Sequence, residues 1–353
     1  MILKRQVILI MAAILLPFFY VNTASASCYF DGPNSRLSNY CAIQSINGKR
    51  IDTRTHRFID QKLKFEGHTN GLGLPSKIIK NTVQPYLSPL LSYSNNINGG
   101  NPSKDLILGN KHWLGDKELY SKSGILAGLE LGLNGRYIYG DGRYLQYSTN
   151  GSYSYNSIHK LGVGSVGASG CDVKNLSEWW YLDICASHYQ IRKDLSESKS
   201  NNLSIVASNF LKITKNSFSQ FKFGFNHYIN SDYEQEQAVV GINTIHPNGI
   251  YTDLNAKFGK AIDTKLVTRL SLSGRMVAQV VDKPLSLSAY YTESEGGIMA
   301  GYDRDERNYG ISISYPIWKK ISLSLGYQIN NSTIDYYDLK TPTVGIVLPA
   351  IQF

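Results

Sequence analysis

The chain of 353 residues carries 36 Lys and Arg against 27 Asp and Glu, a formal net charge of +9, and its mean hydropathy is -0.23. Its 25 Tyr and 31 Gly, with only 4 Met, favour aromatic-rich strands and tight turns over a helical protein. The positive charge is spread along the chain, without a basic stripe or stacking aromatics, which argues against a nucleic-acid-binding protein.

The first 26 residues have the pattern of a signal peptide. Lys4 and Arg5 precede an apolar run at 7–20, and residues 24–26 (Ala-Ser-Ala) are small, as signal peptidase requires. We therefore expect residues 1–26 to be cleaved off after export. The alternative is an apolar run that stays attached as a membrane anchor, although it is short for a helix that spans a bilayer.

Residues 27–81 differ from everything that follows. They have mixed charges, little periodicity and an end rich in Gly and Pro, so we predict a short disulfide-containing segment that plugs or flanks the next domain.

The four cysteines after the signal suggest two local disulfides. Cys28 and Cys41 are 13 residues apart, and Cys171 and Cys185 are 14 apart, in a chain expected to meet an oxidising compartment. Spacing alone leaves the connectivity open. A zinc site is the alternative, but no CxxC or paired His accompanies the thiols. A lipid-modified Cys28 is another, although the leucine usual in lipoprotein signals is missing.

From Thr82 onward, apolar and polar side chains alternate with the two-residue period of a strand. The segment 321–331, ISLSLGYQINN, shows this alternation without a break. We predict fourteen strands, at 83–94, 123–140, 142–156, 158–170, 179–193, 202–213, 219–229, 236–245, 250–260, 264–280, 285–293, 307–317, 321–331 and 341–353.

The predicted connections alternate between long and short. Residues 95–122, 194–202 and 293–306 are expected to form long loops, whereas 140–142 and 316–320 are expected to be tight turns. Long loops at one end and short turns at the other are typical of a bacterial transmembrane β-barrel. A soluble sandwich has no reason to segregate its loops in this way.

One face of these strands is apolar and the other polar. In a sandwich the apolar face would meet a second sheet, and in a barrel it would meet lipid. Tyr and Trp gather near the strand ends, at the level where headgroups would lie. The predicted inward positions are Glu130, Arg136, Asp183, Arg192, Lys222, Asp253, Lys257, Arg269 and Arg275. This basic excess favours anionic or polar solutes, unless the charges pair across strands and fill the barrel.

No catalytic constellation stands out, so we predict neither an enzyme nor a cofactor. Ser187 and His188 are adjacent and therefore face opposite sides of a strand, and His227 would need a serine from across the sheet. Asp303, Asp305 and Glu306 offer oxygens to calcium, but interleaved arginines favour a solvated ion-pair loop, so no metal is expected.

Two loop segments resemble a known family. SYSNNINGG at 92–100 and NSTIDYYD at 331–338 are similar to the corresponding parts of the C-terminal barrel of surface lipoprotein assembly modifiers. The resemblance spans about residues 82–353 as a barrel. It implies a role in bringing lipoproteins to the outer face of the outer membrane, and no functional residue is carried over from it.

The sequence thus predicts an all-β protein, an antiparallel up-and-down transmembrane β-barrel of about fourteen strands over residues 82–353, in the bacterial outer membrane. The predicted function is a passive channel or translocation barrel for polar or anionic solutes. The alternative is a closed lumen whose long loops bind a surface partner or assist lipoprotein display. Expected partners are outer-membrane lipid, lipopolysaccharide and the barrel assembly machinery, with no nucleic acid.

Overall fold

The computed structural model describes residues 35–46, 57, 59–61, 63, 81–108, 111–214, 216–281, 283–318 and 321–352. The predicted signal peptide and Cys28 lie outside these residues. The described part contains one helix of several turns, α2 (Ser35–Ile46), and a large antiparallel sheet. Among the described residues, no helix has the length and apolarity needed to cross a bilayer.

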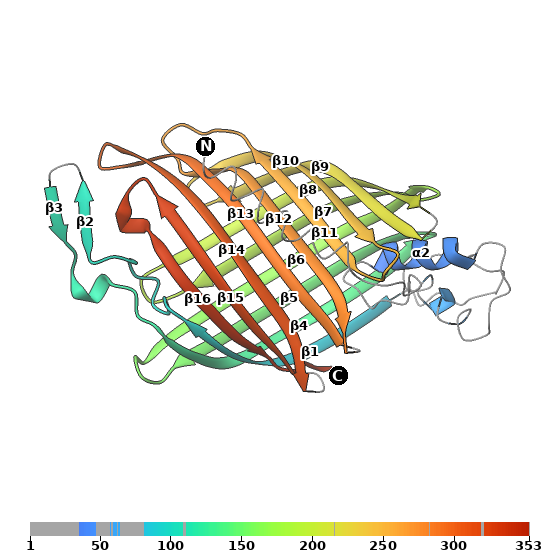
Figure 1. Cartoon of the computed structure of the whole chain (residues 1–353), viewed down its shortest axis with the longest axis horizontal. Helices are drawn as coiled ribbons and strands as arrows, with labels where there is room; N and C mark the ends of the chain where they lie inside the picture. The colour runs from blue at the N-terminus through green and yellow to red at the C-terminus, as the bar shows by residue number, and fades with distance from the viewer. Residues whose placement is uncertain are drawn as a thin grey trace.

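The sheet closes on itself and confirms the predicted barrel of fourteen strands (Figure 1). Each strand pairs antiparallel with the next in the ring, and β1 also pairs with the last strand, Leu90 opposite Val347. The strands are β1 (Asn81–Ser94), β4 (Gly124–Gly140), β5 (Arg143–Asn156), β6 (Leu161–Ser177), β7 (Trp180–Arg192), β8 (Glu197–Thr214), β9 (Ser217–Asn230), β10 (Glu234–Ile245), β11 (Tyr251–Gly259), β12 (Val267–Val280), β13 (Lys283–Met299), β14 (Tyr302–Trp318), β15 (Ile321–Ser332) and β16 (Leu339–Val347).

The predicted last strand, 341–353, is divided in two. β16 ends at Val347, and β17 (Ile351–Gln352) resumes the pairing with β1, Tyr86 opposite Gln352. Pro349 lies in the gap, and a proline has no backbone N–H to donate to a neighbouring strand.

The long loops are fewer than predicted. Only the connection from β1 to β4 is long, and it carries the separate hairpin of β2 (Asp105–Leu108) and β3 (Lys111–Leu114). The predicted loop 293–306 is instead the end of a hairpin in which Met299 pairs with Tyr302. Ala300 and Gly301 both have positive φ, 51° and 84°, as a two-residue hairpin turn requires. The predicted loop at 194–202 likewise shortens to residues 193–196.

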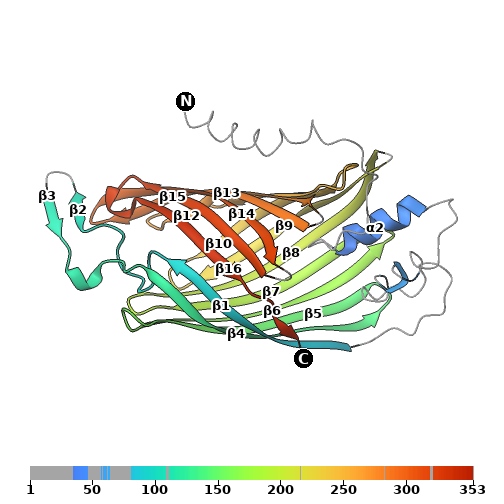
Figure 2. The ribbon, with the colours of Figure 1, turned by 60° about the horizontal axis from the view of Figure 1, so that its bottom comes forward.

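The two ends of the barrel differ. The β2–β3 hairpin extends beyond one end, and α2 lies at the other, where the C-terminal strand also ends (Figures 1 and 2). Because short turns face the periplasm in such barrels, the hairpin end is extracellular and the α2 end is periplasmic.

The outer face of the ring is apolar and exposed. Directly opposed residues of antiparallel strands share a face of the sheet. Once one residue is assigned to the outer face, the register therefore assigns the residues of every other strand to the outer or the inner face. Phe225 is 74% exposed, and the face it belongs to carries Ile125, Leu129, Leu131, Leu145, Tyr153, Val166, Leu203, Ile205, Phe223, Val240, Phe258, Ile311, Ile313, Leu325 and Val344. Hydrocarbon is the solvent that suits such a surface, and a closed sheet leaves no unpaired edge in it. The protein is a β-barrel of the bacterial outer membrane.

The predicted disulfide between Cys171 and Cys185 is confirmed. The two residues are directly opposite each other on β6 and β7, and Cys171 packs against residues inside the barrel. The bond therefore joins the two strands within the wall, several residues before the β6–β7 turn. Cys41 is also in a disulfide, and Cys28, its predicted partner, is outside the described residues.

Removing the wall disulfide should weaken the barrel. The disulfide restricts the unfolded chain by joining two residues that are 14 positions apart, and the double substitution C171A/C185A removes this restriction. We therefore expect the free energy of unfolding to fall by about 2–4 kcal/mol. Urea unfolding in lipid vesicles measures it. As a control, S148A/S169A removes a lumen hydroxyl pair 2.7 Å apart on β5 and β6 and should cost only about 1 kcal/mol. Equal losses in both variants would contradict a stabilising role for the disulfide.

Candidate functional site in the barrel lumen

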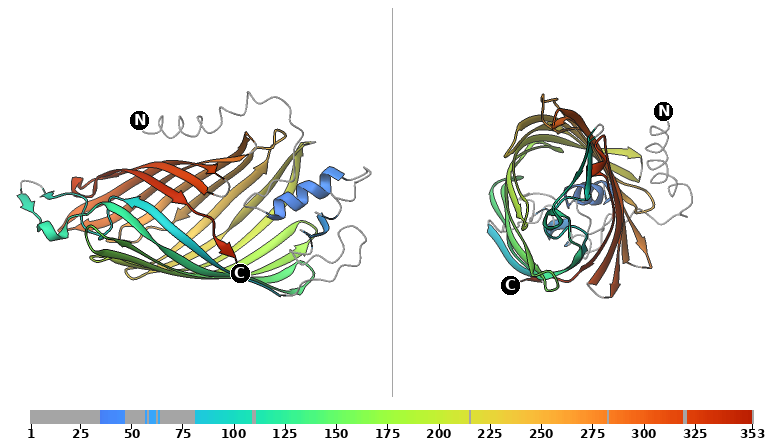
Figure 3. Two further views of the ribbon diagram at one scale, coloured as in Figure 1. Left: turned by 90° about the horizontal axis from the view of Figure 1, so that it is seen from below. Right: turned by 90° about the vertical axis from the view of Figure 1, so that its left-hand side faces the viewer.

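The helix α2 lies inside the periplasmic end of the barrel. Seen along the barrel, it falls within the ring of strands (Figure 3), and it contacts β8, β9 and β10. All six residues from Leu37 to Ala42 are buried. Six consecutive positions cover every side of a helix with 3.6 residues per turn, so this part of α2 is enclosed all round.

An apolar collar of inward-facing strand residues receives the helix. Tyr40 of α2 makes edge-on contact with the ring of Trp179, with centroids 4.7 Å apart, and also contacts the rings of Phe210 and Phe218. Burial raises the pKa of the Tyr40 phenol. The collar consists of Ile138, Tyr144, Val173, Tyr181, Phe210, Phe218, Ile245, Tyr251 and Val277. Lumen residues near the periplasmic turns are therefore apolar because they pack against a helix.

An ion pair joins α2 to the wall. The guanidinium of Arg36 donates two hydrogen bonds to the carboxylate of Asp183 on β7, at 3.0 and 2.6 Å. The side chains of Arg36 and Asp183 are only 17% and 18% exposed. Two parallel hydrogen bonds fix the orientation of the Arg36 side chain against β7, in addition to the attraction between the two charges.

A band of charged residues lies at the level of α2. Arg136 on β4 donates to Gln146 at 2.9 Å, and its guanidinium lies 4.2 Å from the centre of the Tyr144 ring. Lys222 on β9 interacts electrostatically with Asp253, Arg36 and Asp183. Arg275 on β12 is directly opposite Asp253 on β11 and donates to Ser286 at 3.0 Å. Predicted lumen residues from five strands, β4, β7, β9, β11 and β12, thus lie at the level of the helix.

Other predicted lumen residues lie elsewhere. Glu130 is further up β4, where it accepts a 2.7 Å hydrogen bond from the Tyr86 hydroxyl. Lys257 shares the inner face of β11 with Asp253 and is exposed. Arg269 is at a bulge near the extracellular end of β12 and donates to the Gly259 carbonyl.

Arg192 does not face the lumen. It is nine residues after Asp183 on β7, an odd spacing along a strand whose register with β8 is unbroken. Alternation therefore places Arg192 on the outer face, opposite Glu197. The predicted inward position arose from a strand counted with the wrong phase at its extracellular end.

The middle of the lumen is lined by hydroxyl-bearing side chains, mostly small, that border water. Ser273, Tyr290 and Thr343 face inward at mid-height and are exposed, as is Ser169 on the opposite wall. Inside a closed ring of strands, an exposed side chain can only face an internal water-filled space. On β12–β15 this wall carries Ser271, Ser273, Ser286, Ser288, Ser312, Ser314, Ser322 and Ser324.

The extracellular mouth is crossed by the first part of the long connection. Asn95 donates to Thr341 of β16, and at the other side Lys193 donates to the Asn96 carbonyl at 2.8 Å. Burial lowers the pKa of the Lys193 ammonium. Gly99 has φ of 75°, and a Cβ there would lie 2.0 Å from the Ser196 hydroxyl oxygen, so this close approach requires glycine.

Asn98 is fully buried and holds this crossing segment together. Its amide donates to the Tyr120 carbonyl at 2.7 Å, and its side-chain oxygen accepts from the backbone N–H groups of Lys122 and Gly100. The Leu195 N–H donates to the Asn98 carbonyl at 2.8 Å. The Asn98 side chain therefore joins both ends of the long connection, and its backbone carbonyl joins them to the β7–β8 turn.

The histidines considered for catalysis have no serine partner among the described residues. His188 is 2.7 Å from the amide oxygen of Asn201, and His227 is 3.5 Å from Glu234. Ser187 lies on the opposite face of β7 from His188. In the part of the chain that the structure describes, no three His, Cys, Asp or Glu residues are grouped as metal ligands. Asp305 instead accepts from the Gly296 N–H, and Glu306 pairs with Arg304.

No protein-family model and no curated protein matches the chain. Among solved structures, Acinetobacter baumannii OccAB3 is similar at 8% identity and a TM-score of 0.39, over 78% of this chain and 100% of the other. Pseudomonas aeruginosa outer membrane protein OpdK gives 6% and 0.41, over 77% and 98%. Pseudomonas aeruginosa OccK2 (OpdF) in complex with glucuronate gives 8% and 0.38, over 78% and 98%. The resemblance to surface lipoprotein assembly modifiers finds no support among these.

Breaking the ion pair should loosen α2. Removing one partner of a mostly buried pair costs about 3–5 kcal/mol, so R36A and D183A should each speed hydrogen exchange of the α2 amides by at least about a hundredfold. The double variant should cost less than the sum of the singles. R192A, on the other face of β7, is the matched control and should leave the exchange unchanged. Equal hydrogen-exchange rates of the α2 amides in R36A and R192A would show that the Arg36–Asp183 ion pair does not hold α2 in the barrel.

Replacing Asn98 should open the mouth segment. N98A leaves the Lys122 and Gly100 N–H groups buried without their acceptor, at a cost of about 1–3 kcal/mol. We expect faster hydrogen exchange and faster proteinase K cleavage at residues 95–122. N201A removes an exposed asparagine at the same end of the barrel and should change neither rate. A cleavage rate in N98A equal to that of the wild type would show that the Asn98 hydrogen bonds do not hold the mouth segment in place.

Proposed function

We propose that the barrel is a passive channel for small polar solutes. The observation that carries this proposal is the water-bordering inner wall at mid-height, where Ser273, Tyr290 and Thr343 are exposed within a closed ring. A barrel of fourteen strands has an interior too wide for its own side chains to fill. Small hydroxyl groups leave room for a solute and exchange hydrogen bonds with it.

The charges at the level of α2 support a preference for anions. Arg36, Arg136, Lys222 and Arg275 outnumber Asp183 and Asp253 there, and Lys257 adds an exposed cation on the same inner face. A narrow, low-dielectric passage concentrates the potential of such an excess. Proposed lumen-lining residues are Glu130, Arg136, Asp183, Lys257, Arg269 and Arg275, without Arg192.

We further propose that residues 27–81 act as a plug for the barrel over 82–353. The enclosed α2 and its ion pair with Asp183 support this role. The helix packs on the side of β8, β9 and β10, whereas the serine wall, in which Ser273 is exposed and the other serines are half-buried, is on β12–β15. The solute path accordingly follows the serine wall past the helix.

A closed barrel that binds a surface partner is the second candidate. The observation that favours it is the β2–β3 hairpin, which extends beyond the extracellular rim with Trp113 and Leu114 53% and 75% exposed. Leu108, at the turn end of this hairpin, packs against Ile334 and Tyr336. A surface lipoprotein fits this candidate.

Planar-bilayer recording separates the two candidates. We expect stepwise current through the folded protein and an anion preference in a salt gradient. K257Q/R275Q should lower the anion-to-cation permeability ratio about twofold, because it removes two inward cations. R192Q removes a cation from the outer face and should leave the ratio unchanged. Absence of current from folded protein would reject the channel and favour the partner-binding barrel.

A further inference from the structure

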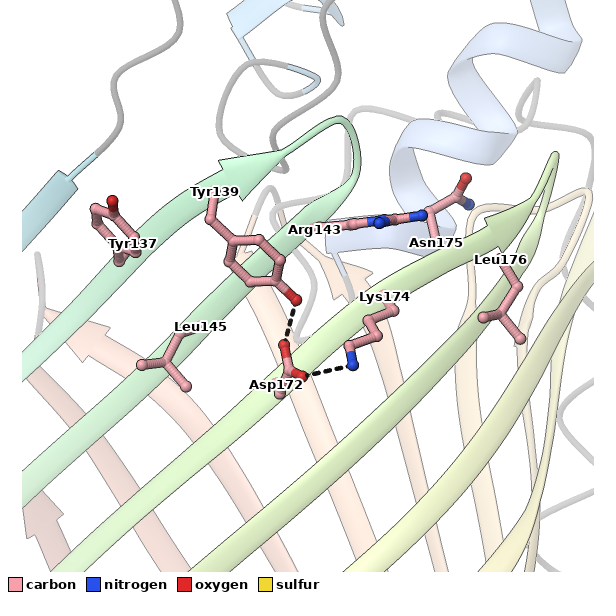
Figure 4. A pocket seen from close by; sticks show the side chains of 8 residues that line it. All are labelled: Tyr137, Tyr139, Arg143, Leu145, Asp172, Lys174, Asn175 and Leu176. Atoms are coloured by element: carbon pink, nitrogen blue, oxygen red, sulfur yellow. Dashed lines mark hydrogen bonds and ion pairs between the residues drawn. The ribbon is translucent and has the colours of Figure 1, made fainter.

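A hollow of about 620 Å³ lies on the outer surface of the barrel near its periplasmic rim (Figure 4). Its walls come from β4, β5 and β6, within a few residues of the β4–β5 and β6–β7 turns. The lining residues Tyr137 and Asp172 belong to the outer face with Leu145, because each is directly opposite it, and the Tyr139 hydroxyl reaches Asp172 on the same face. The hollow therefore opens toward the periplasmic leaflet and not toward the lumen.

Apolar groups form the side of the hollow that faces hydrocarbon. Tyr137, Leu145 and Leu176 are 49%, 41% and 58% exposed. Figure 4 shows Leu145 and Leu176 on either side of a polar group made by Asp172 and Lys174. Acyl chains can cover such side chains, whereas a small hydrophilic ion cannot.

The charges at the polar centre of the hollow partly balance each other. Asp172 accepts a hydrogen bond from the Tyr139 hydroxyl through one carboxylate oxygen, and its other oxygen is 3.1 Å from the Lys174 ammonium. The negative charge of Asp172 thus balances Lys174 and is held in place by Tyr139. Both contacts are drawn in Figure 4.

Arg143 leaves one positive charge uncompensated. Its methylene stem lies over Gly140, where a Cβ would be 3.3 Å from the Arg143 Cδ. The guanidinium extends across the hollow toward Asn175 (Figure 4) and has no hydrogen-bond or ion-pair partner in the described part of the chain. A planar guanidinium at a lipid boundary is well stabilised by an oxyanion whose oxygens accept two of its hydrogen bonds, such as a phosphate.

We propose that this hollow binds the phosphodiester headgroup of an anionic phospholipid from the periplasmic leaflet. Arg143 holds the phosphate, Lys174 contributes the second cation, and the acyl chains lie along Tyr137, Leu145 and Leu176. The net charge of +1 from Arg143, Lys174 and Asp172 matches one phosphodiester. The site is separate from the lumen and does not depend on the proposed channel function.

Native mass spectrometry of the full chain in mild detergent, titrated with phosphatidylglycerol, tests the proposal. The wild type should retain one lipid per barrel, and R143Q/K174Q should weaken retention about tenfold. D172N removes the anion that balances Lys174 and should strengthen retention about threefold. R192Q, an outer-face cation at the opposite end of the barrel, should bind lipid like the wild type.

The arms also distinguish the source of the phosphate. Inorganic phosphate at millimolar concentration should not displace the lipid, and diacylglycerol, which has no phosphate, should not be retained. Wild-type retention in R143Q/K174Q, displacement by inorganic phosphate or equal retention of diacylglycerol would each overturn the proposal. Heat-modifiable migration on gels verifies folding. If R143Q/K174Q does not fold, lipid retention by D172N decides: stronger retention than in the wild type supports the proposal, and equal or weaker retention overturns it.

Discussion

The closure of β1 onto β16 is the constraint on which the rest of the structure depends. In hydrocarbon no water is available to satisfy a free sheet edge, so fourteen strands remain in the membrane only as a ring. Once the ring is closed, each residue position is committed to lipid or to lumen, because directly opposed residues share a face all the way round. The lipid-facing Leu131 and the lumen-facing Glu130 differ only in the parity of their positions on β4.

That parity explains why the strands could be predicted from the sequence and the connections could not. ISLSLGYQINN alternates throughout, and β15 (Ile321–Ser332) matches it almost residue for residue. The segment 293–306 has the Gly and charged residues of a loop, yet it pairs across the turn at Ala300 and Gly301 and carries its charges on strands that extend the hairpin. Polar composition indicates contact with water, and long hairpins that rise above the membrane have that contact too.

Most charged residues of the lumen were predictable, and a plug formed by residues 27–81 was one of two predicted alternatives, but the contacts that hold α2 inside the barrel were not predictable. Charged positions such as Arg136 and Arg275 follow from alternation within one strand, whereas Arg36 and Asp183 are 147 residues apart and meet only because α2 enters the barrel. The segment around Arg36 has no strong amphipathic pattern, since a helix enclosed on all sides needs none. A run of large apolar residues at inward positions near the periplasmic turns, Tyr181, Phe210 and Phe218 among them, was the available signal of an occupant.

The same reasoning separates two kinds of charge in the wall. Charges on the inner face find partners in the lumen or in its water, as Arg275 does with Ser286, and they influence what passes. Charges on the outer face can pair only with neighbouring side chains or with lipid. Asp172 pairs with neighbouring side chains, those of Tyr139 and Lys174. Arg143 has no such neighbour among the described residues, and its position at the periplasmic rim leaves a lipid phosphate as the partner that chemistry favours. An unmatched cation on the lipid face is thus evidence about the membrane, just as an unmatched cation in the lumen is evidence about the solute.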